Sequence, residues 1–228
     1  MRRVLIGTPA HAGTLEARYV FSLTQTIRAG IKALIDIEER FICYGSILQT
    51  VRNDLVWHAL DRGFDDLVFI DADQDWKPED FLKLLSHDVD CVGAAIVKKT
   101  EDQELYNVFA PGLDMPVDLK TGLLVVPGVG TGFLRLSRKA LQVLWDGAEE
   151  YTIDHKPAGR WIFDIRPNAE HDLVGEDILV ATKLNAAGIR VHVDPTIVCG
   201  HIGVKRYQGD FGSYIARIKA NTRAANVL

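Results

Sequence analysis

The sequence lacks long hydrophobic runs and paired cysteines. No apolar stretch approaches the roughly 20 residues that a membrane-spanning helix needs, and the apolar part of the start, MRRVLIG, is too short for a secretory signal peptide. Cys43, Cys91 and Cys199 lie far apart without the spacing of a disulfide framework or a zinc site, so we expect small buried residues in a reducing compartment. A cytoplasmic protein without a membrane span is therefore expected.

Two nucleotide-binding signatures are missing as well. A dinucleotide-dependent oxidoreductase should carry GxGxxG after its first strand, where this chain has GTPAHAG at residues 7–13. No phosphate loop that ends in Gly-Lys-Ser or Gly-Lys-Thr occurs. The net charge of −5 argues against a surface that binds nucleic acid throughout.

The charge is unevenly distributed. Residues 201–228 carry five basic side chains and one acid, so this end has a charge of +4 and the remainder −9. The basic residues are Lys205, Arg206, Arg217, Lys219 and Arg223. A solvated terminal helix explains them, and so does attraction of an anionic ligand or of nucleic acid.

Segments typical of strands and helices alternate through the first 100 residues. Strands are predicted at 3–7, 40–44, 66–70 and 89–97, and helices at 16–35, 47–60 and 78–85. This alternation predicts an α/β fold with a mostly parallel central sheet and helices on both faces. Farther along we expect an irregular mobile loop at 101–116, strands at 123–126, 129–136 and 189–193, and helices at 138–146 and 176–187. With 228 residues and no repeat or convincing linker, one domain is expected.

Acidic residues follow the third predicted strand at once. In LVFIDADQDW (67–76), four apolar residues precede Asp71, Asp73 and Asp75. Ligands of open α/β proteins bind at this carboxyl edge of the sheet. In an extended chain Asp71 and Asp73 project to one side, where two carboxylates repel unless a cation or proton lies between them. Such ligands favour Mg²⁺ or Mn²⁺, but one acid, Asp75 above all, could instead cap the helix that begins near Pro78.

Five segments, in this order and spacing, resemble GT-A type glycosyltransferases, in particular small bacterial and bacteriophage members. They are Arg52-Asn53, Asp71-Ala72-Asp73, Gly130-Thr131-Gly132-Phe133, Gly175-Glu176-Asp177, and Asp194-Pro195 through Gly200-His201. The resemblance covers about residues 4–210. It implies a single GT-A (Rossmann-like) domain over 1–228, with a nucleotide-binding half at about 1–100, an acceptor and donor-sugar half at about 101–210 and a basic C-terminal helix at about 211–228. A cell of a bacterium or a phage-infected host is the implied location.

The resemblance also implies a nucleoside-diphosphate sugar donor, with a UDP-sugar favoured, and a metal ion. Asp73 would contact Mn²⁺ or Mg²⁺, Asp71 the ribose, the metal or both, and His201 would complete the coordination. His201 has the structural alternative of an ordinary polar residue after a strand. The other residues expected to bind the donor are Thr8, Pro9, Arg52, Asn53, Ala72, Lys98, Thr131 and Gly132.

Some of these residues have structural alternatives. A surface salt bridge also explains Arg52, and a solvated pair explains Lys98 with Lys99. Residues 7–11 depart from the family pattern, in which Tyr, Asn or Ser follows the proline, so the nucleotide base stays open.

Glu176 and Asp177 open the late predicted helix. Acids in a first turn are stabilised by the helix dipole, which is a sufficient structural reason for both and predicts a low pKa. An ionised carboxylate there could accept a proton from an acceptor hydroxyl. Inverting family members have their base at this position, so the resemblance implies Asp177 as the base and Glu176 as a contact of the sugar or acceptor.

Two other functions stay open. A sugar-phosphate nucleotidyltransferase also needs paired acids and a metal, although it usually carries a glycine-rich and basic stretch after its first strand. A non-catalytic nucleotide-sugar binding module would keep the sheet without the chemistry. The acceptor is equally open: DNA with hydroxymethylated bases, suggested by the basic C-terminal end, a lipid diphosphate, a polysaccharide or a protein.

Overall fold

A seven-stranded mixed sheet organises the protein. The computed structural model describes residues 1–101, 103–111, 115–169 and 171–225. The sheet has the strand order β2-β1-β3-β9-β5-β14-β7, in which β9 and β7 run antiparallel to the other five strands. The strands are β1 (Arg2–Ala10), β2 (Ile35–Cys43), β3 (Asp66–Ile70), β5 (Cys91–Gly93), β7 (Leu124–Val126), β9 (Phe133–Ser137) and β14 (Val191–Val193). The predicted α/β class with a mostly parallel sheet is confirmed.

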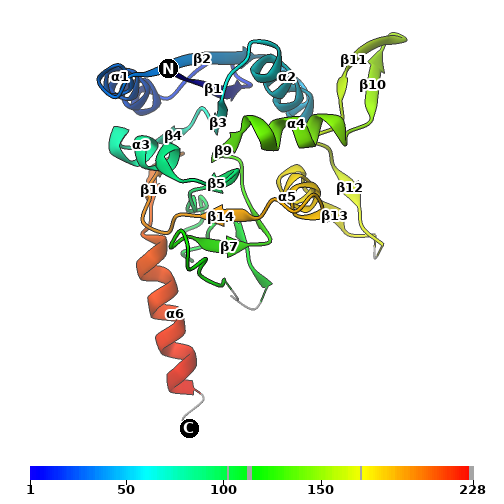
Figure 1. Cartoon of the computed structure of the whole chain (residues 1–228). Coiled ribbons are helices and arrows are strands. Elements are labelled where there is room, and N and C mark those ends of the chain that lie inside the picture. Colours follow the sequence, from blue (N-terminus) through cyan, green and yellow to red (C-terminus); the bar gives the residue numbers. More distant parts are fainter. Residues whose placement is uncertain (102, 112–114, 170, 226–228) are drawn as a thin grey trace.

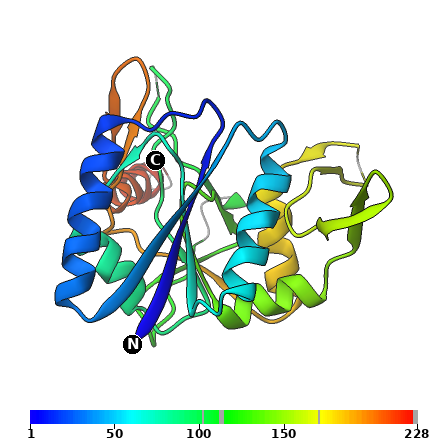
Figure 2. The same ribbon diagram turned by 90° about the horizontal axis from the view of Figure 1, so that it is seen from above.

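Helices cover both faces of this sheet, as the sequence predicts (Figure 1 and Figure 2). On one face lie α1 (Ala17–Lys32) and α3 (Pro78–Ser86), and on the other lie α2 (Leu48–Asp61), α4 (Arg138–Asp146) and α5 (Glu176–Ala186). Strand β3 shows the reason.

Successive side chains of β3 enter opposite apolar clusters. Leu67 and Phe69 belong to the cluster of α2, α4 and α5, whereas Val68 and Ile70 belong to that of α1 and α3. All four side chains are fully buried. Because side chains alternate along a strand, a wholly apolar strand is stable only between two such layers.

The remaining strands form small sheets around the central one. β4 (Gln74–Asp75) pairs with β15 (Gly200–Ile202), which pairs with β16 (Arg206–Gln208). The other pairs are β6 (Val108–Phe109) with β8 (Gly128–Val129), β10 (Glu150–Ile153) with β11 (Lys156–Arg160), and β12 (Arg166–Pro167) with β13 (Leu173–Val174). The last helix, α6 (Phe211–Ala225), begins with Phe211 packed on Tyr106 and extends away from the sheet (Figure 1).

Several predicted elements end elsewhere in the structure. The strand expected at 89–97 is only Cys91–Gly93, because the chain then leaves the sheet and the Ile96 N–H donates to Asn107 Oδ1 (2.7 Å). The strand expected at 129–136 is divided into β8 and β9. Part of the irregular loop expected at 101–116 forms β6, while residues 102 and 112–114 lie outside the described residues.

The cysteines are not all buried. Cys91 and Cys199 are buried as expected, but Cys43 is exposed, which corrects that prediction. It is the last residue of β2, at the edge of the sheet. In the part of the chain that the structure describes, no helix has the length and apolar character needed to cross a membrane.

Candidate active site

A pocket lies where β1 and β3 end, next to the start of α2. Its volume is about 370 Å³. It brings together six residues that the sequence analysis singled out: Pro9, Arg52, Asp71, Ala72, Asp73 and His201. Its wall is completed by residues of the β1–α1 connection and of α2, namely His11, Ala12, Thr14, Glu16 and Leu48.

The two aspartates of this pocket do not lie in an extended chain. After β3 the backbone turns, and the Gln74 N–H donates to the Asp71 carbonyl (3.1 Å), so the expected alternation of side chains does not apply. Each carboxylate has its own basic partner. Asp71 Oδ1 is 3.3 Å from Arg52 Nη2, and Asp73 Oδ2 is 2.5 Å from Lys99 Nζ. Two separate cations of the protein therefore relieve the repulsion between the carboxylates.

His201 faces Asp73 from β15. Its Nε2 is 3.5 Å from Asp73 Oδ2, and its Nδ1 is 2.9 Å from the Val97 carbonyl oxygen. Because a carbonyl only accepts hydrogen bonds, Nδ1 carries a proton. Without a second proton on the ring, Nε2 would be an acceptor that faces the carboxylate, which is an acceptor as well. Two such acceptors face each other stably only with a proton or metal ion between them. A second ring nitrogen that donates to a backbone carbonyl is typical of metal-binding histidines.

The carboxyl of Asp73 is held in its ionised form. Burial acts to raise its pKa, but hydrogen bonds from His201 and Lys99 outweigh burial and lower the pKa to about 2. An ionised carboxylate beside an imidazole nitrogen is a suitable start for a metal site, because a metal ion can take the place of the proton between them. Among the described residues, however, no group of three or more His, Cys, Asp or Glu side chains is arranged to hold an ion. The donor set fits a divalent ion that takes its other ligands from phosphate and water.

Arg52 joins the acidic end of β3 to the first turn of α5. Its side chain is only 4% exposed, and it contacts Asp71 through Nη2 and Glu176 through Nη1. The guanidinium also lies 5.9 Å from the centre of the Phe163 ring. This buried pairing replaces the surface salt bridge that the sequence left open. It fixes both carboxylates relative to one another, because each is held by a different nitrogen of the same buried guanidinium.

Asp177 has a raised pKa, contrary to the expected low one. Burial is the main cause; a hydrogen bond from the Ile178 N–H (2.8 Å) lowers the pKa, and the charge of Glu176 raises it further. Loss of solvent therefore outweighs the helix dipole at this position. A carboxylate with a raised pKa is a stronger base, which suits acceptance of a proton from a hydroxyl.

Comparisons with known proteins give a likeness in structure and none in sequence. No protein-family model and no curated protein matches the sequence. The crystal structure of A197 from STIV matches 89% of this chain and 86% of its own, with 17% sequence identity and a TM-score of 0.55. The fold is that of GT-A type glycosyltransferases.

Two further solved structures resemble this chain less closely. The catalytic domain of Drosophila β1,4-galactosyltransferase 7, in complex with xylobiose, has 12% identity and a TM-score of 0.47, with 85% of this chain and 65% of that chain covered. TarS from S. aureus, in complex with UDP-GlcNAc, has 14% identity and a TM-score of 0.45, with 85% and 56% covered. This chain therefore spans less than two thirds of either protein.

Within this GT-A fold, two residues predicted to bind the donor belong to the interior. Thr8 is fully buried, and its hydroxyl lies 2.5 Å from that of Tyr19. Asn53 uses both ends of its amide on the Phe163 backbone, donating to the carbonyl (3.1 Å) and accepting from the N–H (2.7 Å). Neither lines the pocket, because both side chains satisfy buried partners, and donor binding by either stays a prediction.

Of the two lysines, Lys99 and not Lys98 contacts a pocket residue. Both are exposed and neither lines the pocket, but Lys99 is paired with Asp73. The pair of lysines after a strand indicated the place, but only the backbone direction decides which side chain turns inward. Nothing in the sequence distinguished the two.

Thr131 and Gly132 lie behind the acidic residues. A Cβ at Gly132 would be 3.2 Å from Asp71 Oδ2, so glycine leaves the room that this carboxylate occupies. Thr131 is 4% exposed and does not line the pocket. The structure thus places Gly132 beside a pocket residue and Thr131 in the interior.

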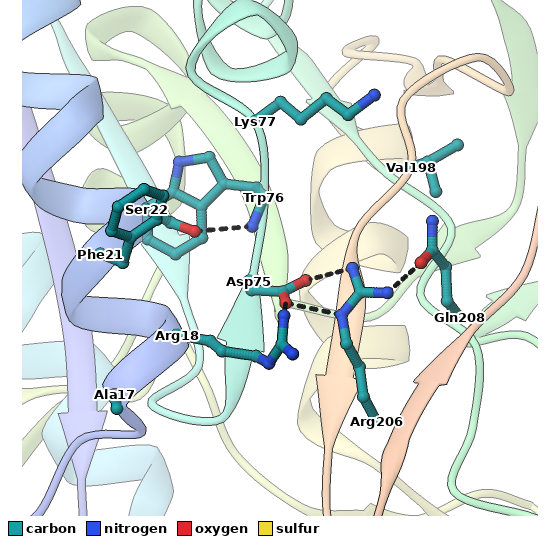
Figure 3. Close-up of a pocket in the computed structure, with 10 residues that line it drawn as sticks. All are labelled: Ala17, Arg18, Phe21, Ser22, Asp75, Trp76, Lys77, Val198, Arg206 and Gln208. Carbon is teal, nitrogen blue, oxygen red and sulfur yellow. Dashed lines mark hydrogen bonds and ion pairs between the residues drawn. The ribbon is translucent and has the colours of Figure 1, made fainter.

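Asp75 does not cap a helix, which corrects that expectation. The N-cap residue of α3 is Lys77, which makes no side-chain cap. Asp75 instead accepts two hydrogen bonds from Arg206, from Nε (2.6 Å) and Nη2 (2.7 Å), as Figure 3 shows. The pair joins β4 to β16 across β15 at Gly200, where a Cβ would collide with Asp75 Oδ1. It thereby holds β15, and with it His201, beside the acidic strand end.

Replacing Asn53 tests its structural role. In Asn53→Ala the Phe163 N–H and C=O lose their buried partners, which should lower the free energy of unfolding by about 2–4 kcal/mol. The measurement is urea denaturation followed by circular dichroism. Gln142→Ala is the control, because that amide is exposed and donates to Asp146 within the same helix. Unchanged stability together with weaker nucleotide binding would support the donor-binding assignment.

Replacing Lys99 tests the ion pair with Asp73. Lys99→Met should raise the pKa of Asp73 above about 2, because one hydrogen bond and one positive charge are lost. Since the folded-state pKa lies below the usual value, the pair stabilises the fold above about pH 4 and its contribution fades as the pH falls toward 2. NMR titration of the carboxyl carbons measures this. Lys98→Met should leave the Asp73 pKa unchanged, and equal effects of the two variants would contradict the assignment.

Proposed function

We propose that this protein is a metal-dependent glycosyltransferase that moves a sugar from a nucleoside-diphosphate sugar, with a UDP-sugar favoured, to an acceptor hydroxyl. The observation that carries the proposal is the 3.5 Å approach of His201 Nε2 to the ionised Asp73 carboxylate at the edge of the sheet. A carboxylate and an imidazole with a pocket beside them favour the interpretation as a site for Mn²⁺ or Mg²⁺ over that as a purely structural ion pair. The fold supports the proposal but does not by itself assign a reaction.

The donor would occupy the pocket with its diphosphate toward Asp73 and His201. When bound, a divalent ion would supply Lewis-acid neutralisation of the charge on the departing diphosphate. Lys99 has to release Asp73 for this to happen, and its ammonium then remains within reach of phosphate oxygens. Asp71, held by Arg52, can accept a hydrogen bond from a ribose hydroxyl through its second oxygen.

The acceptor hydroxyl would approach from the α5 side of the pocket. Glu176 is engaged by Arg52, which makes it a positioning group. Asp177 has the raised pKa that a base requires, and it is our candidate for taking the hydroxyl proton. The proposed base, Asp177, and the positioning group, Glu176, thus lie next to one another at the start of α5.

DNA as the acceptor stays a prediction that the structure does not strengthen. Three of the five basic residues at the C-terminal end have acidic partners: Lys205 with Glu101, Arg206 with Asp75, and Arg217 with Glu104. Their charge is balanced locally, so less of it acts on a distant phosphate backbone.

The metal assignment is tested by removing either ligand. Asp73→Ala and His201→Ala should each weaken Mn²⁺-dependent binding of UDP about 100-fold or more, because each removes a ligand that the small donor set needs. Calorimetric titration with and without Mn²⁺ measures this, and circular dichroism confirms folding. His155→Asn is the control: this histidine has a left-handed backbone (φ 62°) that asparagine tolerates. Unchanged affinity in both ligand variants would remove the metal site.

The base assignment is tested by Asp177→Asn. This variant should keep nucleotide affinity and lose transfer by about 10²–10⁴-fold, the usual contribution of a general base. Because the base acts when deprotonated, kcat/KM of the wild type should fall as the pH drops through the raised Asp177 pKa. The assay follows a panel of nucleotide sugars, from which a glycosyltransferase releases nucleoside diphosphate. A parallel assay with nucleoside triphosphates and sugar 1-phosphates releases pyrophosphate if the protein is a nucleotidyltransferase. Full transfer by Asp177→Asn would contradict the assignment.

A further inference from the structure

A second cavity lies on another face of α2, between this helix and the β10–β11 hairpin. Its volume is about 380 Å³, and none of its lining residues belongs to the pocket described above. We name it the hairpin groove and define it by its aromatic and charged side chains: Asp54, Trp57, Trp145, Glu150, Tyr151 and Arg160. The hairpin projects from the end of α4 (Figure 1).

Three aromatic rings line this groove. Trp57 is 45% exposed although it is a large apolar side chain, and Trp145 and Tyr151 are half-buried. Two of the rings are fixed. The Arg160 guanidinium lies 5.3 Å from the Trp145 ring centre, and Tyr151 packs on Trp161 at 4.5 Å between ring centres. Fixed aromatic faces, with their negative quadrupole, bind the weakly positive C–H face of a pyranose ring.

A missing side chain keeps Tyr151 in place over the hairpin. Tyr151 and Gly159 are cross-strand partners of β10 and β11. A Cβ at Gly159 would be 2.6 Å from the Tyr151 hydroxyl oxygen, so any other residue would push the ring out of its position. The missing side chain of Gly159 therefore lets the Tyr151 ring lie where it forms one wall of the groove.

The charged groups of the groove suit hydroxyls more than phosphates. Asp54 and Glu150 are negative and Arg160 is positive, so the three carry a net charge of −1. Arg160 Nη2 is bound to Glu150 Oε1 (2.9 Å), and Arg160 Nη1 donates to the Trp145 carbonyl (3.0 Å). The guanidinium is thus already engaged, and Asp54 Oδ2 lies 3.7 Å from Arg40 Nη2, so no unpaired cation stands among these side chains to meet a phosphate. Neighbouring hydroxyls of a neutral sugar can instead donate to these carboxylates.

The position of the groove relates it to the acceptor side of the candidate active site. Asn53 lines the groove and holds the Phe163 backbone, and the Phe163 ring lies beside the Arg52 guanidinium of the pocket. Figure 2 shows the hairpin on the same side of the molecule as α5, whereas α1 lies on the opposite side. The groove and the start of α5, which carries Asp177, therefore lie on the same side of the molecule.

We propose that the hairpin groove binds a neutral saccharide unit of the acceptor, several sugars away from the hydroxyl that is glycosylated. The acceptor role depends on the function proposed above, but saccharide binding does not. The groove assigns the acceptor to the oligosaccharides and polysaccharides, not to nucleic acid. Trp57 and Tyr151 would be the main contacts, and Asp54 and Glu150 would select orientation through sugar hydroxyls.

The test is calorimetric titration of the full chain with neutral hexasaccharides, without nucleotide or metal. The probes are cello-, chito-, xylo- and maltohexaose. At least one should bind saturably, and Trp57→Ala and Tyr151→Ala should each weaken it about ten-fold or more, the loss expected for an aromatic anchor. Trp57→Phe should restore part of the affinity. Phe21→Ala is the matched control, since Phe21 is 67% exposed on α1.

Three results would overturn the proposal. The first is that none of the four saccharides binds the wild-type protein. The second is that a saccharide binds Trp57→Ala as tightly as the wild type. The third is a dimer in sedimentation that Trp57→Ala dissociates and saccharide does not, which would make the groove an interface between copies of this chain. Thermal unfolding of each variant shows whether a loss reflects folding, and Trp57→Phe keeps the test valid if Tyr151→Ala unfolds.

The donor assay separates this inference from the proposed function. Suppose that a saccharide binds in a way that depends on Trp57, but no nucleotide sugar releases nucleoside diphosphate. That result would support the saccharide site in the groove and refute the glycosyltransferase proposal. Transfer of a sugar to a saccharide acceptor, with the same KM for that acceptor in Trp57→Ala and in the wild type, would support the glycosyltransferase and refute the groove as an acceptor site.

Discussion

The buried guanidinium of Arg52 is the contact on which the candidate site depends. It lies between Asp71, at the end of β3, and Glu176, at the start of α5, and these acids are more than one hundred residues apart in the chain. A lysine could satisfy one of these carboxylates, but the planar fork of arginine reaches both at once. The geometry of the pocket therefore follows from a helix, α2, whose other buried residues are mostly apolar.

A second pair positions the histidine in the same manner. Asp75 and Arg206 join β4 to β16, and the strand between them carries Gly200 and His201. Gly200 has no side chain that would collide with the Asp75–Arg206 pair. The hydrogen bond between His201 Nδ1 and the Val97 carbonyl then orients the ring so that Nε2 faces Asp73. The third acid of the segment that follows β3 is thus structural, yet it decides where a proposed metal ligand lies. Site and scaffold share one short run of sequence here.

Much of the fold could be predicted from the sequence, because burial leaves a strong pattern. The residues of β3, α4 and α5 follow from apolar runs and helical periodicity, and β3 and α4 have the predicted bounds. The antiparallel direction of β9 could not be predicted, since an apolar strand buried on both faces has the same pattern in either direction. The end of β5 could not be predicted either, because the Ile96 N–H, beyond the strand, donates to the side chain of Asn107 and not to a neighbouring strand.

Site residues were harder to predict, for a physical reason. A polar residue on a buried helix has to be satisfied, but its partner can be a ligand or the backbone: Arg52 faces the pocket, and its neighbour Asn53 faces Phe163. The sequence signal is the same for both. Likewise Lys98 and Lys99 differ only in direction, and the raised pKa of Asp177 depends on burial that its place in a helix did not reveal.

Basic side chains of the protein balance the charge of the acids in and beside the pocket. Asp71 and Glu176 share Arg52, Asp73 has Lys99, and Asp75 has Arg206. Binding of an ion at Asp73 would therefore be an exchange in which the Lys99 ammonium is displaced. The net binding free energy would be the difference between the interactions of Asp73 with the metal ion and with the ammonium. A diphosphate that bound with the ion would increase this difference, because its oxygens could act as further ligands and could give the displaced ammonium a new partner. On the proposed function, metal and donor bind together more tightly than either binds alone, and the resident lysine is the physical origin of that coupling.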